Sequence, residues 1–89
     1  MISRQVQVTG RVQGVGFREW TARQARAKGV AGWVRNCSDG SVEAVVSGPD
    51  AMVEALIAAL HEGPPAARVA NLRVSEAAMQ EGSGFRIEA

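Results

Sequence analysis

Residues 32–46 read GWVRNCSDGSVEAVV, and this stretch decides the fold. Asp39 and Gly40 lie near its centre, and an Asp-Gly pair favours a tight turn between two antiparallel strands. We therefore expect a β-hairpin, with one strand at residues 32–37 and the return strand at residues 41–46.

Before the hairpin, the sequence predicts a strand followed by a helix. Residues 5–8 alternate polar and apolar side chains, as in a strand with one buried face. Residues 17–28 are rich in good helix formers, and Gly29 follows as a C-terminal stop. Three small residues share one face of this helix and should pack on a sheet: Thr21, Ala22 and Ala25. Trp20 falls well off that face, so we expect it at a rim.

After the hairpin, a second helix and further strands are expected. Gly48-Pro49-Asp50 opens the helix, with Pro49 in the first turn and Asp50 favourable to the helix dipole. Its core stripe recurs at helical spacing through Val53, Leu56, Ile57 and Leu60. Residues 63–65 end the helix, residues 68–75 form a less regular strand, and residues 85–87 could add a short edge strand.

This order of elements is strand–helix–strand–strand–helix–strand, typical of the split βαβ motif. We therefore predict an α+β, ferredoxin-like sandwich with a four-stranded antiparallel sheet in the order 4-1-3-2. Both helices should cover one face of that sheet. With 89 residues, the chain is expected to form a single domain over residues 1–89.

Composition limits the function classes. Ten basic and nine acidic side chains give a net charge of +1, without the basic excess that a long nucleic-acid track needs. The single cysteine, Cys37, cannot form an intrachain disulfide, which favours an intracellular compartment. No stretch approaches the roughly 20 apolar residues of a membrane span. We expect a cytoplasmic protein and take a monomer as the default.

The predicted topology brings two unusual features together. The first and second strands run in the same direction with the third between them, so their C-terminal ends open on the same edge of the sheet. A glycine-rich turn at residues 10–16 ends the first strand, and Asn36 ends the second. Two strand spacings separate them by about 10 Å, which a loop and two side chains can bridge.

Each feature has both a functional and a structural explanation. Backbone N–H groups in a strand-to-helix turn can bind an anion at the positive end of the helix dipole, and Arg18 could close over it. Asn36 could hold a water molecule and a substrate oxygen, since its amide both donates and accepts. Alternatively, the turn is an ordinary connection with a solvated arginine, and Asn36 starts the hairpin turn. Taken singly, each feature favours the structural explanation.

Longer motifs favour function. Residues 10–18, GRVQGVGFR, resemble the first signature of the acylphosphatase family at every defining position. Residues 32–36, GWVRN, followed by Gly40, Val42 and Gly48, resemble the second at its spacing, and residues 63–69 are similar to the stretch before the family's fourth strand. The resemblance extends over essentially the whole chain. One departure is Cys37, where the family commonly has threonine.

The resemblance implies hydrolysis of acyl phosphates to a carboxylate and inorganic phosphate. By it, Arg18 binds the phosphate and Asn36 positions the attacking water. Backbone donors would come from the loop residues Gln13, Gly14, Val15, Gly16 and Phe17. The expected partner is a small-molecule acyl phosphate, with neither nucleic acid nor membrane.

We expect neither a cofactor nor a metal, because no cluster of His, Cys, Asp and Glu has metal-ligand spacing. Glu19 lies about 100° around the helix from Arg18 and should be solvated. His61, at the end of the second helix, is expected to be structural. Catalysis would therefore act by positioning and charge stabilisation, as is usual for phosphoryl transfer.

Three alternatives compete with this interpretation, and the sequence favours a stand-alone hydrolase over them. An RNA-recognition domain would display aromatics on its central strands, but residues 5–8 and 42–45 contain none. A small-molecule regulatory domain on this fold would not need both Arg18 and Asn36. An acylphosphatase-like domain that binds carbamoyl phosphate in a larger maturation enzyme would require appended domains.

Overall fold

The computed structural model, which describes residues 1–80 and 82–89, contains five strands and two helices. Their bounds in chain order are β1 Ile2–Arg11, α1 Phe17–Ala27, β2 Ala31–Asn36, β3 Val42–Gly48, α2 Asp50–Glu62, β4 Arg68–Glu76 and β5 Phe85–Ile87. Every predicted element is present, although strand ends differ from the predicted ones by up to three residues.

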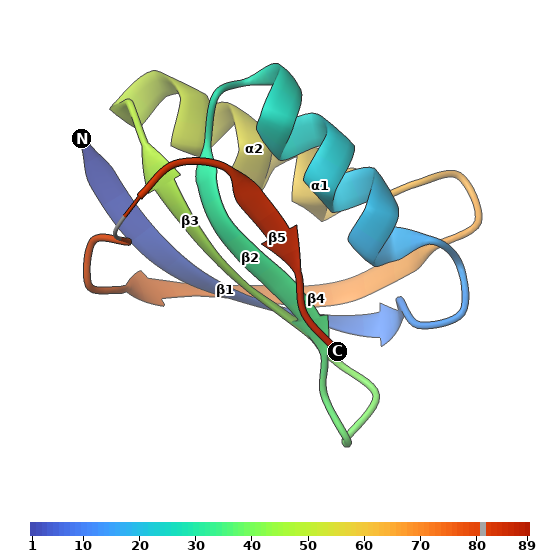
Figure 1. The fold of residues 1–89 in the computed structure, drawn as a ribbon. Coiled ribbons are helices and arrows are strands. Elements are labelled where there is room, and N and C mark those ends of the chain that lie inside the picture. The colour runs from blue at the N-terminus through green and yellow to red at the C-terminus, as the bar shows by residue number, and fades with distance from the viewer. Residues whose placement is uncertain (81) are drawn as a thin grey trace.

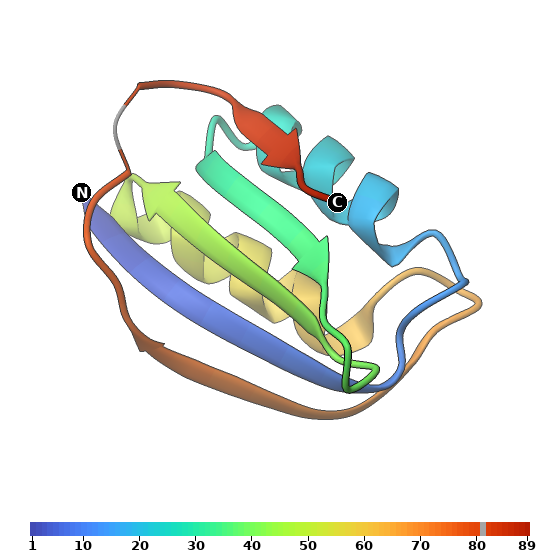
Figure 2. The same ribbon diagram turned by 60° about the horizontal axis from the view of Figure 1, so that its bottom comes forward.

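The sheet has the order β4-β1-β3-β2-β5. Antiparallel pairing joins β1 to β3, β1 to β4 and β2 to β3, which confirms the predicted 4-1-3-2 arrangement. The short edge strand β5 is also present and runs parallel to β2. Both helices lie on the same face of the sheet (Figure 1). Figure 2 views the sheet from its other, open face, with the helices behind it.

The core lies between the helices and the sheet. Val6, Val34 and Val46 of the three inner strands are fully buried, because alternate residues of each strand point towards the helices. From α2 the predicted stripe reaches them: Val53, Leu56 and Leu60 are buried, and Ile57 is half-buried against the same cluster. From α1 the buried small residues are Thr21, Ala22 and Ala25, as predicted.

A β-bulge corrects the predicted start of the glycine-rich turn. Gly10 was expected to lie outside regular structure, but β1 continues to Arg11 because β4 pairs with it. The register shifts between Thr9, opposite Asn71, and Gly10, opposite Val69. Gly10 has φ 123°, and a Cβ there would lie 2.2 Å from the carbonyl oxygen of Arg68, so glycine is required.

The ends of the helices differ slightly from expectation. Pro49 precedes α2 as its N-cap, with an extended ψ of 138°, instead of lying in the first turn. Trp20 is half-buried at the rim as predicted, and its ring meets the ring of Phe17 edge-on at 5.6 Å. Neither helix of the described residues is long and apolar enough to span a bilayer.

Candidate active site

The strand ends meet as the topology predicts. Val42 of β3 pairs with Val8 of β1 on one side and with Asn36 of β2 on the other. A single strand, β3, therefore separates Asn36 from the C-terminal part of β1. The chain leaves β1 through residues 12–16 and enters α1 at Phe17. The loop, the start of α1 and the end of β2 therefore surround one region at this edge of the sheet.

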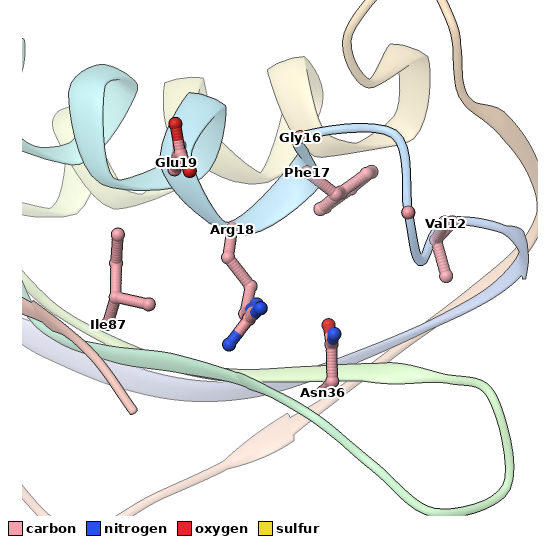
Figure 3. A pocket seen from close by; sticks show the side chains of 8 residues that line it. Val12, Gly16, Phe17, Arg18, Glu19, Asn36 and Ile87 are labelled. Carbon is pink, nitrogen blue, oxygen red and sulfur yellow. The ribbon is translucent and has the colours of Figure 1, made fainter. Parts of the chain in front are cut away.

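A cavity of about 210 Å³ occupies that region (Figure 3). Its lining residues come from the loop, α1, β2 and β5: Val12, Gly14, Gly16, Phe17, Arg18, Glu19, Asn36 and Ile87. Figure 3 shows the Arg18 side chain pointing from α1 towards the sheet, and the Asn36 amide pointing from β2 into the space beside Arg18. The two side chains that the sequence singled out thus face the same space.

The loop owes its shape to Gly14 and Gly16. Their φ angles are 73° and 76°, while Val15 between them keeps a negative φ. A Cβ at either glycine would meet nothing within 4 Å, so the backbone conformation and not crowding favours glycine. Positive φ at two glycines that flank a residue with negative φ is compatible with an anion-binding nest, in which successive N–H groups turn towards one side.

These N–H groups have no acceptor in the described part of the protein. From Gly14 to Arg18, none donates to a carbonyl or a side chain of residues 1–80 or 82–89. Gly16 is the N-cap of α1 and has no side chain to accept a bond from the first turn. Unpaired donors at the positive end of a helix dipole attract an anion.

Arg18 is half-buried in the first turn of α1. Its Nη1 donates to the carbonyl oxygen of Glu88 at 3.2 Å, just beyond β5. Glu88 is itself attached to the sheet, because its N–H donates to Val34 at 2.8 Å. Within the described residues Arg18 has no carboxylate partner, so its positive charge and remaining donors stay available to a ligand.

Asn36 is half-buried, and its amide makes no hydrogen bond to the described residues. The hairpin turn is closed by other groups: Cys37 N–H donates to Ser41 at 2.9 Å, and Asp39 Oδ1 accepts from the Ser41 hydroxyl at 2.6 Å. This hydroxyl bond, followed by the Ser41 N–H bond, lowers the pKa of Asp39. Forming the turn therefore does not explain Asn36.

Two of the predicted loop residues do not line the cavity. Val15 packs partly buried against the core. The Gln13 side chain reaches the β2–β3 turn, where Nε2 donates to the carbonyl oxygens of Cys37 and Ser41. For both residues only the backbone is placed to take part in the predicted loop.

Other cavity residues escaped the sequence reasoning. Glu19 is exposed, as predicted, yet it also lines the cavity, because the start of α1 lies at the rim. Ile87 and the Glu88 carbonyl lie at the site because β5 pairs in parallel with β2. No local sequence pattern predicts this pairing. His61 is exposed in the last turn of α2 and is not among the cavity residues.

Comparison with known proteins agrees with this fold. The acylphosphatase family profile matches residues 4–87. An acylphosphatase of Rhodospirillum rubrum is 51% identical over 80 residues, which is 90% of this chain and 88% of that protein. The crystal structure of acylphosphatase from Bacillus subtilis superposes with a TM-score of 0.94 at 37% identity, over the full length of both chains.

A larger protein contains a similar unit. The crystal structure of HypF from T. kodakarensis matches all of this chain with a TM-score of 0.85 at 37% identity, but the match covers 12% of the HypF chain.

The fold and these matches define the class of protein as a small hydrolase. The chain belongs to the acylphosphatase family, whose members hydrolyse acyl phosphates.

Proposed function

We propose that the chain, as a single domain over residues 1–89, hydrolyses acyl phosphates by direct attack of water on phosphorus. The observation that carries this proposal is the composition of one cavity: the Arg18 guanidinium and the Asn36 amide point into it, and loop residues whose N–H groups are unpaired within the described residues line it. A dianionic phosphoryl group needs such a set of donors, and an attacking water needs a polar group to orient it.

In this proposal the phosphoryl oxygens accept hydrogen bonds from Arg18 and from backbone N–H groups of the loop formed by Gln13, Gly14, Val15, Gly16 and Phe17. These donors belong to the fold before substrate binds, so little reorganisation opposes the reaction. Asn36 holds the water on the opposite side of phosphorus from the acyl oxygen.

The chemical step balances without a general acid. The water oxygen forms a bond to phosphorus, and the bond from phosphorus to the acyl oxygen breaks, with its electron pair leaving on the carboxylate. One water proton passes to the substrate's own phosphoryl oxygen. The acyl phosphate dianion and water thus become a carboxylate monoanion and dihydrogen phosphate.

The proposed reaction uses neither a metal nor a cofactor. In the described residues no three His, Cys, Asp or Glu side chains gather in a way that could hold an ion. We assign the stabilisation of phosphoryl charge to Arg18, the loop amides and the α1 dipole, since Arg18 and the residues at the start of α1 line the cavity.

The open face of the sheet favours the cavity as the functional site over a nucleic-acid surface. The two middle strands, β1 and β3, present Gln5, Gln7 and Glu43 there, and Glu43 is held by Gln5 and by Arg35 at 2.7 Å. Neither β1 nor β3 displays an aromatic side chain on which bases could stack. A monomer that acts in the cytoplasm remains a prediction from the sequence.

The test is hydrolysis of benzoyl phosphate in excess EDTA. Wild type should turn over, and Arg18→Ala and Asn36→Ala should each lower kcat/KM by a factor on the order of 10²–10³. Arg23→Ala is the matched control, because Arg23 is an exposed arginine of the same helix. A folded but inert wild type would refute the proposal, as would a strict need for added divalent ions.

A further inference from the structure

The Gln13 side chain links the loop before α1 to the turn between β2 and β3. Its Nε2 lies 2.8 Å from the carbonyl oxygen of Cys37 and 2.9 Å from that of Ser41. Both partners are acceptors, so only the NH₂ side of the amide can face them, and each of its hydrogens meets one oxygen. The orientation of this amide is therefore determined by its partners.

The link joins the two halves of the proposed site. Gln13 directly precedes Gly14, the first glycine of the loop, and Cys37 directly follows Asn36. Both neighbours line the cavity. Any movement of the loop relative to the turn would shift the N–H groups that hold phosphate relative to the amide that holds water.

The turn does not need Gln13 for its own shape. The Ser41 carbonyl also accepts from the Cys37 N–H at 2.9 Å, and the Cys37 carbonyl accepts from the Gly40 N–H at 3.2 Å. Asp39 Oδ1 further accepts from the Ser41 N–H at 3.0 Å. Without Gln13 both carbonyls would still be paired, so loss of the link should leave the turn folded.

We propose that Gln13 is a positioning residue: its side-chain amide sets the separation between the phosphate-holding loop and Asn36. This inference rests on the proposed function. In-line attack requires the water oxygen to stand roughly 3–3.5 Å from phosphorus, so a small slip of one half against the other lowers the rate. Phosphate binding depends on the loop and Arg18 alone, and should change little.

The experiment compares Gln13→Met with Gln7→Met, each with benzoyl phosphate as substrate and inorganic phosphate as inhibitor. Methionine has a similar length but no N–H donor. Gln7 is the matched control, because its Nε2 donates to the Ser41 hydroxyl at 3.2 Å from β1, outside the loop. Gln13→Met should lower kcat by on the order of 10–100-fold while changing the Ki for phosphate by less than about twofold. Gln7→Met should change neither.

A double-mutant cycle separates positioning from a merely structural role. If Gln13 acts through Asn36, adding Gln13→Met to Asn36→Ala should cost little further kcat, since no water remains to be placed. Independent, multiplying losses would overturn the inference, as would an unchanged kcat or an equal loss in Gln7→Met. If Gln13→Met does not fold, Gln13→Asn, too short to reach both carbonyls, serves in the same cycle.

Failure of the inference is distinguishable from failure of the proposed function. An inert wild type, or full activity in Asn36→Ala, would refute the proposed function itself. Full activity in Gln13→Met beside an impaired Asn36→Ala would refute the positioning role alone.

Discussion

Replacing Gly16 by alanine separates the cost of its backbone conformation from the role of the loop in binding. Gly29, just beyond the other end of α1, provides a matched position. The φ angles are 76° at Gly16 and 67° at Gly29, and a Cβ at either would meet nothing within 4 Å. Both substitutions therefore place alanine in the left-handed region without a steric clash.

The expected loss of stability is similar for the two variants. An L-residue in the left-handed region costs roughly 1–2 kcal/mol. Alanine also restricts the unfolded chain, which offsets ~0.4–1 kcal/mol of this and leaves a net loss of about 1 kcal/mol. For a domain of this size, about 1 kcal/mol lowers Tm by roughly 4–8 °C.

The effect on binding should differ. In Gly16→Ala partial relief of this strain rotates the loop and changes the direction of its N–H groups. We expect kcat/KM to fall by on the order of 10–100-fold and the Ki for inorganic phosphate to rise, whereas Gly29→Ala should retain both. Thermal melts and steady-state assays well below Tm measure the two effects separately. Full activity in a Gly16→Ala variant that loses the same stability as Gly29→Ala would refute the role of the loop conformation.

Three further predictions concern the core, the turn and the C-terminal segment. Leu56→Ala, at a fully buried position of α2, should cost about 2–5 kcal/mol in denaturant unfolding, and a loss under about 1 kcal/mol would contradict the core described above. Because the folded pKa of Asp39 is lowered, its charge stabilises the fold above its ordinary pKa of 3.8. That contribution is lost as pH falls through the folded pKa. The Tm difference between wild type and Asp39→Ala should therefore shrink from pH 7 towards about pH 3. A Tm difference that does not change with pH would contradict this role of Asp39. Deleting Glu88 and Ala89 removes the carbonyl that accepts from Arg18 and the N–H that donates to Val34, so kcat/KM should fall several-fold and Tm should fall slightly. Unchanged kinetics would show that the carbonyl contact does not orient the guanidinium.

Local patterns were sufficient to predict most of the fold. Asp39-Gly40 marked the hairpin, the apolar spacing of α2 marked its buried face, and the order of elements implied which strand ends share an edge. Topology predicted that Asn36 and the loop before Arg18 meet at this edge of the sheet. Asn36 and Arg18 both line the cavity.

What escaped prediction depends on contacts between distant segments. The β-bulge follows from the pairing of β1 with β4. One signal of it was present in the sequence, because Val69 and Leu72 stand three residues apart and yet both pack on the core. In a regular strand, residues three apart point to opposite faces. The approach of Ile87 and Glu88 to the site has no local signal, because β5 is short and its parallel partner lies far back in the chain. The direction of the Gln13 side chain is likewise set by the turn it meets.

The most direct test of the central claim is to follow oxygen during hydrolysis of benzoyl phosphate by wild type in ¹⁸O-labelled water with excess EDTA. Attack of water on phosphorus predicts turnover well above the buffer rate, with the label in the released phosphate and none in benzoate. Label in benzoate would place the attack at the acyl carbon. That result, or a rate no faster than buffer, would contradict the account of a cavity in which Arg18 and the loop hold phosphate while Asn36 positions water.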